Sequence, residues 1–311
     1  MDSNLLPIEN PRPLGGGKYA DVFEGTAKRG AHRGKTVVLK VARSELRSTE
    51  GVTGGVYFAQ GLFFATGSVS TWDPDPNEVI RTEGDILAKI RHPAFVRLLD
   101  RGESFGRQYL LLERVAGRTW REVIYDDPRS LFESLVELVR ALADVAASGE
   151  LRFHGDLKPE NLLLDDSKRT RILDPSSGMA RLGPGGVPSQ LVLTDWYNPA
   201  LELSDLPSLG LLIAEVYTRR QLVLAASDDR PAKTLGPRLG DWIRLREITG
   251  GAKLMRRLPH LPLPSELEPS VPKGIDEIVL KCLGLGFKKG LLDAIDPYSG
   301  PAELVMALER R

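Results

Sequence analysis

The chain has 311 residues, and its 42 basic and 42 acidic side chains balance. Balanced charge argues against the strong positive field that attracts nucleic acid or an anionic membrane surface. The only cysteine, Cys282, excludes an internal disulfide. No apolar run reaches the roughly 20 residues of a membrane span, and the first residues lack the basic start and apolar run of a secretory signal. We expect a cytoplasmic protein, long enough for one two-lobed unit or two domains.

A glycine cluster lies between two strand-like segments near the start of the chain. Residues 14–23 read LGGGKYADVF, and the β-branched run TVVLKV follows at 36–41. Such a cluster commonly marks a simple turn between strands. Its glycines, Gly15 and Gly17, would also let a backbone close over phosphate groups, because no side chain intervenes.

Lys40 lies inside the second of these strands, where a buried ammonium needs an ionic partner. The candidate partner is Glu83, which opens a segment with Ile86, Leu87 and Ile90 at helical spacing. A glutamate on a helix is more often simply solvated. The order of the motifs nevertheless favours a Lys40–Glu83 pair.

Two further features concern the segment that leads from Lys40 into this helix and the helix itself. An insertion at about 44–77 contains the aromatic-rich stretch 56–67, which is bounded by glycines and predicts a hairpin packed on the small lobe. The hairpin either extends the sheet and covers the helix, or forms a docking surface for a regulatory partner. Gly84 weakens the helix by about 1 kcal/mol relative to alanine, so a mobile helix is a hypothesis.

Two apolar segments follow. Residues 108–113 predict a strand that ends in the sequence Glu-x-Val-x-Gly, from Glu113 through Val115. Between residues 131 and 145, apolar side chains recur at helical spacing and predict a core helix. The apolar positions are Leu131, Leu135, Leu138, Val139, Leu142 and Val145.

Residues 154–161, HGDLKPEN, carry the chemistry. Phosphoryl transfer needs a group that orients the attacking hydroxyl, positive charge at the phosphoryl oxygens and ligands for a metal ion. Asp156, Lys158 and Asn161 can supply these three functions. Asp174, eighteen positions after Asp156, adds a second oxygen ligand of the kind Mg²⁺ prefers. By itself, an aspartate before a proline is an ordinary turn.

These motifs, in this order, resemble those of the eukaryotic-type (Hanks-type) serine/threonine protein kinases. The resemblance implies an α+β bilobal fold, with a small antiparallel-sheet lobe at 1–113 and a larger, mainly helical lobe at 114–311. It also implies transfer of the ATP γ-phosphate to a serine or threonine of a protein substrate, with Mg²⁺ held by Asn161 and Asp174. The residues implied for the nucleotide are Gly15, Gly17, Val22, Val38, Lys40, Glu83, Glu113, Val115 and Leu163, of which Glu113 and Val115 act through their main chains.

One departure from the family pattern concerns regulation. Gly155 replaces the arginine that in many kinases binds a phosphorylated activation loop. Residues 178–188 have few phosphorylatable side chains. We expect an activity that does not depend on phosphorylation of Ser176, Ser177, Ser189 or Thr194, and that is constitutive or controlled by a partner.

A second departure concerns the metal-binding segment, which reads Asp174-Pro175-Ser176 in place of Asp-Phe-Gly. Because proline restricts the residue before it, we expect Asp174 to be extended and the segment to resist flipping. Residues 194–202 resemble a degraded substrate-docking segment, and Asp205 resembles the aspartate that braces the catalytic loop. Two alternatives therefore stay open: a pseudokinase or nucleotide-binding scaffold, and a small-molecule kinase, since relatives of that kind also carry His-Gly-Asp.

Overall fold

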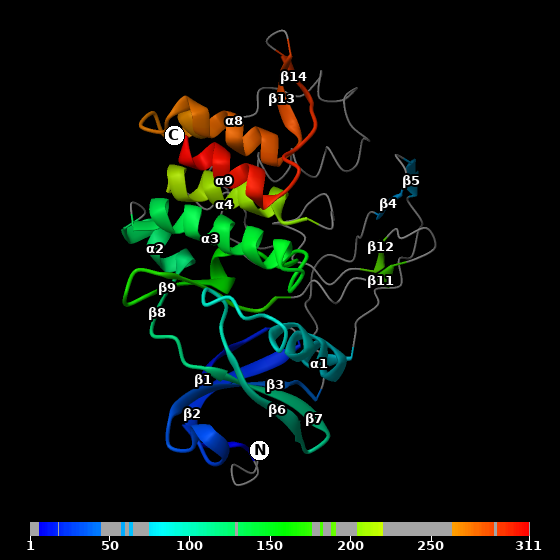
Figure 1. Ribbon diagram of the computed structural model, residues 1–311, viewed down its shortest axis with the longest axis vertical. Helices are drawn as coiled ribbons and strands as arrows, with labels where there is room; N and C mark the ends of the chain where they lie inside the picture. The colour runs from blue at the N-terminus through cyan, green and yellow to red at the C-terminus, as the bar shows by residue number, and fades with distance from the viewer. Residues whose placement is uncertain are drawn as a thin grey trace, which may run out of the picture.

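The computed structural model has a small lobe built on a sheet and a large lobe built on helices (Figure 1). It describes residues 6–17, 19–44, 57–59, 62–64, 75–127, 130–175, 181–182, 188–190, 204–219, 263–288 and 291–310. The α+β bilobal fold expected from the sequence is confirmed. None of the helices in these ranges is long and apolar enough to cross a membrane.

The small lobe is a five-stranded antiparallel sheet in the order β1-β2-β3-β7-β6. Its apolar residues form two clusters, one of which includes Ile80 and Leu87 of helix α1. The elements are β1 (Ile8–Gly16), β2 (Ala20–Ala27), the 3-10 turn η2 (Gly30–His32), β3 (Thr36–Ala42), α1 (Pro76–Leu87), β6 (Leu98–Ser104) and β7 (Arg107–Glu113).

Helix α1 begins earlier than the motif at Glu83 suggested. Asp75 caps it by accepting the backbone N–H of Asn77 at 3.0 Å, and Pro76 takes the first helical position, where its missing N–H costs no hydrogen bond. Gly84 is buried against β7, since a Cβ there would lie 2.8 Å from Leu110 Cδ2. Glycine thus allows a close approach of helix and sheet, which is a packing reason for this residue and does not indicate mobility.

A hairpin does form within the insertion. Its strands β4 (Tyr57–Ala59) and β5 (Leu62–Phe64) pair with each other in a separate sheet, so they do not extend the five-stranded one. Figure 1 shows both strands away from the small-lobe sheet. Packing of the hairpin on the small lobe, as expected from the sequence, is therefore not what the described strands show.

The large lobe surrounds one apolar core. The predicted stripe on α3 (Ser130–Ala147) is buried at every position, and α4 (Leu206–Thr218) is buried on nearly all sides because other elements cover it. The remaining elements are β8 (Gly117–Thr119), α2 (Trp120–Asp126), the 3-10 turn η3 (Pro159–Asn161), β9 (Leu162–Asp165), β10 (Thr170–Ile172), β11 (Arg181–Leu182), β12 (Pro188–Gln190), α7 (Pro264–Leu267), α8 (Lys273–Cys282), β13 (Leu285–Lys288), β14 (Leu291–Ala294) and α9 (Pro301–Glu309).

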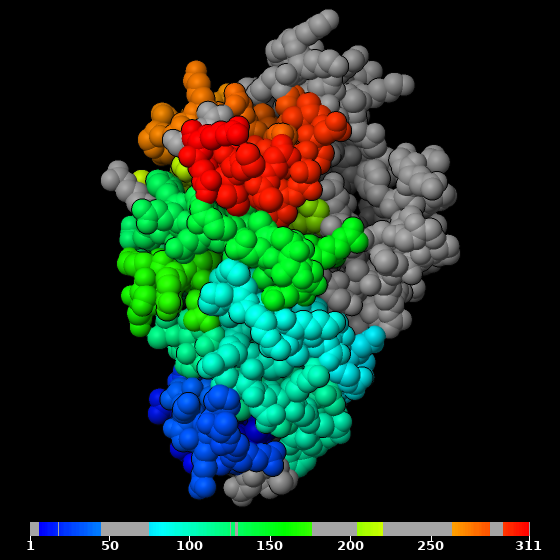
Figure 2. Space-filling view, viewed as in Figure 1, coloured from blue at the N-terminus to red at the C-terminus, as the bar shows by residue number. Residues whose placement is uncertain are grey.

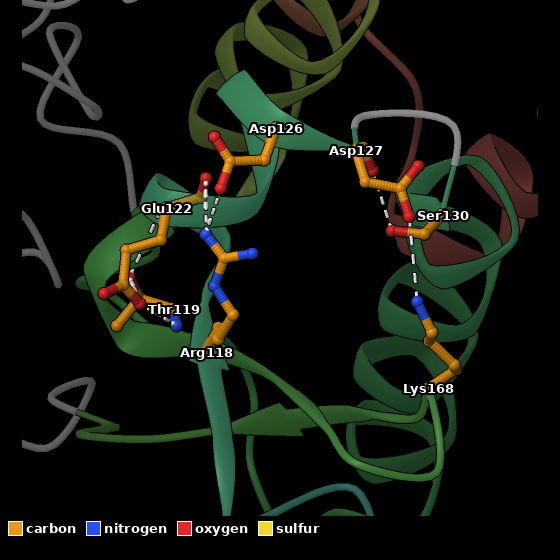
Figure 3. A network of polar contacts seen from close by, with 7 residues as sticks. All are labelled: Arg118, Thr119, Glu122, Asp126, Asp127, Ser130 and Lys168. Carbon is orange, nitrogen blue, oxygen red and sulfur yellow. Dashed lines mark hydrogen bonds and ion pairs between the residues drawn. The ribbon is translucent and has the colours of Figure 1, made fainter.

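The connection between the lobes runs from β7 into β8 and α2. A capping box begins α2: Thr119 Oγ1 accepts the N–H of Glu122 at 3.4 Å, and the Glu122 carboxylate accepts the Thr119 N–H at 2.8 Å. Arg118 binds the carboxylate of Asp126 at the far end of the same short helix. Figure 3 shows this network. The capping box satisfies backbone N–H groups in the first turn of α2 and so fixes where this helix begins after the interlobe connection.

Candidate active site

Lys40 connects the two lobes. It is paired in the sheet with Val22 on β2 and Leu110 on β7, and its side chain is 11% exposed. Its Nζ lies 2.7 Å from Glu83 Oε2 on α1 and 2.9 Å from Asp174 Oδ2, just after β10 of the large lobe. The three residues expected to meet around a nucleotide therefore do meet.

The electrostatics of this cluster favour a charged lysine. Burial lowers the pKa of Lys40, but the carboxylates of Asp174 and Glu83 outweigh it and hold that pKa above its ordinary value. Burial also raises the pKa of Glu83 to about 7, against the opposing effect of Lys40. Glu83 Oε1 is buried with no hydrogen-bond partner among the described residues. A phosphate could replace Asp174 as the second anionic partner of Lys40.

Asp174 corrects a prediction. Its φ is +53°, in the left-handed region, whereas the following proline was expected to keep it extended. Neighbouring contacts hold the segment: the Leu173 N–H donates to the Asn161 carbonyl at 2.9 Å, and His154 Nε2 donates to the Leu173 carbonyl at 2.7 Å. These contacts, with the Lys40 ion pair, override the local preference. Such a conformation costs about 1–3 kcal/mol and is typical of functional sites.

The catalytic loop holds its carboxylate in one orientation. Asp156 Oδ2 accepts from Lys158 Nζ at 2.8 Å and from Asn161 Nδ2 at 2.9 Å, and the same amide nitrogen reaches the Asp156 carbonyl at 2.8 Å. The Asp156 side chain is 19% exposed. An oriented, partly exposed carboxylate beside an ammonium suits a group that positions a hydroxyl for attack.

Asp205 holds the backbone of the catalytic loop, as expected from the sequence. Its carboxylate is buried and accepts the backbone N–H groups of His154 at 2.6 Å and Gly155 at 3.0 Å. Gly155 has φ of +87°, a conformation that glycine adopts without steric cost. The backbone of the loop therefore gives its own reason for a glycine at this position.

Asn161 and Asp174 fit a magnesium site. The amide nitrogen of Asn161 donates to the carbonyl and the carboxylate of Asp156. The amide oxygen is not used in these bonds and can bind a cation. The Asp174 side chain is 40% exposed, and its Oδ2 lies 2.9 Å from Lys40 Nζ. The antiparallel pairing of Leu162 with Ile172 brings the two ligand segments to the same end of a hairpin. Amide and carboxylate oxygens are ligands that Mg²⁺ prefers, with phosphate and water for the rest of its shell.

An apolar cluster spans the two lobes beside this polar centre. Leu112 and Val115 are buried, and Val38 and Leu163 pack against them partly buried. Leu163 lies on β9 of the large lobe and Val38 on β3 of the small lobe. These residues can sandwich a flat ring. At the end of β7, the Glu113 N–H already donates to the Arg97 carbonyl at 3.0 Å, and the Val115 carbonyl already accepts from the Arg114 guanidinium. The remaining main-chain groups are therefore the Glu113 carbonyl and the Val115 N–H.

The glycine cluster forms the turn between β1 and β2. Gly15 pairs with Val22, which is half-buried, and the Gly17 N–H donates to the Ala20 carbonyl at 3.0 Å. A Cβ on Gly16 would lie 2.8 Å from the Ala20 carbonyl oxygen. The turn therefore requires the middle glycine for space, and it requires Gly15 for its backbone conformation, because φ there is +158°, which L side chains rarely adopt; Gly17 has open space around it.

Sequence reasoning missed two contributors. His154 was seen only as part of a motif, yet it is fully buried; its Nε2 holds the Leu173 carbonyl, and its Nδ1 accepts the Asp156 N–H at 3.2 Å. Arg171 binds the Glu113 carboxylate, a contact between positions 58 residues apart. The adjacency of His154 to Asp156 was a signal for the first; nothing in the sequence indicated the second.

Several residues discussed from the sequence lie outside the described part of the chain. These are Ser176, Ser177, Thr194 and the segment 194–202, and the side chain of Ser189. Expectations about loop phosphorylation and substrate docking stay predictions.

A two-lobed fold in which a buried lysine meets two carboxylates beside an oriented aspartate is the arrangement expected of a phosphotransferase. Residues 8–236 match the family model of the protein kinase domain, so the chain belongs to the protein kinase family. Among its relatives is the serine/threonine-protein kinase pkn2 of Myxococcus xanthus, 30% identical over 178 residues, which cover 55% of this chain and 18% of the relative.

A probable serine/threonine-protein kinase of Streptomyces coelicolor is 25% identical over 307 residues, which cover 89% of this chain and 38% of the relative. The human hormonally up-regulated neu tumor-associated kinase is 36% identical over 100 residues, 30% of this chain and 14% of the relative. The chain thus spans less than two fifths of the length of each of these relatives.

Proposed function

We propose that this chain is an active serine/threonine protein kinase that uses ATP and Mg²⁺ and does not need phosphorylation of its activation loop. The observation that carries the proposal is the convergence of Lys40, Glu83 and Asp174 around one ammonium, with both ion-pair distances below 3 Å. A scaffold that only binds nucleotide does not require an oriented Asp156 as well.

Each group then has a role that follows from its position. Lys40 binds the α and β phosphates, and Glu83 holds Lys40 in place. Asn161 and Asp174 would hold Mg²⁺, which would supply positive charge at the phosphate oxygens. Asp156 orients the hydroxyl of the acceptor and receives its proton, and Lys158 stabilises charge on the transferred group. The Ser/Thr assignment rests on Lys158 following Asp156 by two positions and on the names of the relatives.

Independence from loop phosphorylation rests on Gly155. A glycine has no guanidinium with which to hold a phosphorylated residue, and the Asp205 carboxylate braces the loop backbone without one. Control by a partner at the insertion 44–77 is part of the same proposal.

The test is phosphate transfer from labelled ATP. Purified chain is incubated with Mg²⁺ and a generic protein substrate, beside Asp156→Asn, which keeps the size of the side chain and removes its charge. Label in protein that is lost in Asp156→Asn supports the proposal. Thermal stabilisation by ATP without transfer contradicts it in favour of a scaffold, and label confined to small molecules contradicts it in favour of a small-molecule kinase.

A further inference from the structure

Besides the covalent connection after Glu113, the Lys40–Asp174 ion pair and the apolar cluster around Leu163, the lobes touch at one further place. The loop at residues 91–97, between α1 and β6, is bound to the large lobe. The Arg91 N–H donates to Glu150 Oε2 at 2.9 Å, and the loop exchanges backbone hydrogen bonds with Ile172 on β10 at 2.9 Å and 2.7 Å. Figure 2 shows the cyan part of the small lobe pressed directly against the green part of the large lobe.

The Glu113 carboxylate lies where this loop, the interlobe connection and β10 meet. Its Oε1 accepts the Arg97 N–H at 2.9 Å and also binds the guanidinium of Arg171 on β10. Arg171 Nη2 lies 3.4 Å from the Phe95 carbonyl, a second contact with the loop. One carboxylate and one guanidinium thus join three segments.

The pair is only partly solvated. The side chains of Arg171 and Glu113 are 15% and 24% exposed, and Arg171 Nε is buried with no hydrogen-bond partner among the described residues. Leaving a guanidinium donor unpaired costs free energy, so stability alone is a poor reason for this arrangement. Arg171 also lies three residues before Asp174 on the same segment, which places the pair next to the metal-binding aspartate in the chain.

We propose that the Glu113–Arg171 ion pair is a latch that restricts rotation of one lobe against the other. Rotation about the connection after Glu113 moves that carboxylate away from β10 and breaks the pair. With the pair closed, Lys40 and Asp174 stay at a separation suited to one nucleotide and its metal. Glu113 and Arg171 are positioning residues in this scheme, and the latch rests on the proposed function because it orders that same nucleotide site.

The test is a double-mutant cycle read on nucleotide affinity. Arg171→Gln and Glu113→Gln leave the main chain of Glu113 in place, and the control is Arg169→Gln, which removes an ion pair with Asp165 by an arginine that is 68% exposed. We expect each latch substitution to raise the Kd and the KM for ATP about fivefold, and the double variant to be no worse than the more affected single one, as for pairs in contact. Turnover of Arg171→Gln at saturating ATP should change less than twofold, and Arg169→Gln should match the wild type.

Lobe motion can be measured directly. Spin labels on cysteines introduced at Lys35 and Glu133, both exposed, report the interlobe distance; Cys282 is buried, and burial raises the pKa of its thiol, so it should stay unlabelled. The distance distribution should broaden in Arg171→Gln and not in Arg169→Gln. If Arg171→Gln does not fold, Arg171→Lys replaces it, with a smaller rise in Kd expected because lysine lacks the fork that reaches Phe95 as well.

Different results overturn different claims. The latch is overturned if the increases in Kd for ATP caused by the two single substitutions multiply in the double variant. It is also overturned if the Tm falls while ATP affinity and interlobe distances stay unchanged. A wild-type chain that binds ATP and transfers no phosphate overturns the proposed function, while the affinity cycle and the distances still decide whether the latch exists.

Discussion

The guanidinium of Arg121 on α2 lies 3.0 Å from the carboxylate of Glu215 on α4, although 94 positions separate them. Glu215 is fully buried, and the Nε of the same arginine donates to Glu160 in the catalytic loop at 2.8 Å. The arginine therefore connects the helix after the interlobe connection, the catalytic loop and the centre of the large lobe.

Arg121→Met should be strongly destabilising. Removing one partner of a buried ion pair leaves a desolvated charge and typically costs about 3–5 kcal/mol. Urea unfolding measures this. The control is Arg140→Gln, which breaks an exposed pair with Glu309 and should cost about 0–1 kcal/mol. If the two variants lost the same free energy of unfolding, the Arg121–Glu215 pair would contribute no more than an exposed ion pair.

The pH dependence of stability should carry the signature of Glu83. Its pKa is raised by burial to about 7 in the folded protein, against about 4.3 when unfolded. Between these values the folded state binds more protons than the unfolded state, so the free energy of unfolding should fall as pH rises through this window. Glu83→Gln does not titrate and should remove that slope. Parallel curves for the two proteins from about pH 4 to 7 would contradict the assignment.

Gly84→Ala should destabilise the protein, although alanine is the better helix former. The new methyl would lie 2.8 Å from Leu110 Cδ2, in a buried contact between α1 and β7. Overpacking of this kind costs about 1–3 kcal/mol, more than the helical gain of about 1 kcal/mol. The double variant Gly84→Ala/Leu110→Ala should be more stable than the two single effects added together predict. A stabilised Gly84→Ala, in denaturant unfolding, would show that Gly84 is not placed for packing.

Asp174→Asn should act through the metal. An amide is a weaker ligand for Mg²⁺ than a carboxylate, so half-maximal transfer should need more Mg²⁺ and the maximal rate should fall on the order of 100-fold, as for loss of one electrostatic contact in other enzymes. A chelator should stop transfer by the wild type. Asp296→Asn, at an exposed site, is the control, and an unchanged Mg²⁺ requirement in Asp174→Asn would exclude Asp174 as a ligand.

Phosphatase treatment should leave the transfer rate unchanged, since Gly155 offers no cation to a phosphorylated loop. Gly155→Arg should not make the enzyme dependent on phosphorylation. It should cost about 1–2 kcal/mol instead, because φ at this position is +87° and a side chain is strained there. Activity lost on dephosphorylation, and regained on phosphorylation of Ser176, Ser177, Ser189 or Thr194, would contradict this prediction.

Much of the site was predictable from short-range order in the sequence. Asp156, Lys158 and Asn161 are neighbours along the chain, and a single loop brings them together. A buried lysine in a strand needs an anion, and the resemblance to protein kinases implied Glu83 as the partner of Lys40. The core helix at 131–145 was predicted because its apolar side chains recur at helical intervals and therefore lie on one face.

The tertiary structure alone decided the conformation of Asp174, the reason for Gly84 and the contacts of Arg171. A proline disfavours some backbone conformations of the preceding residue, but that local preference is small beside an ion pair and the hydrogen bonds that hold Leu173. The fit of Gly84 depends on a strand more than twenty positions away, and Arg171 meets Glu113 from 58 positions away. Local sequence fixes which chemistry a segment can perform, whereas packing between distant segments sets strain, close approach and the position of one lobe against the other.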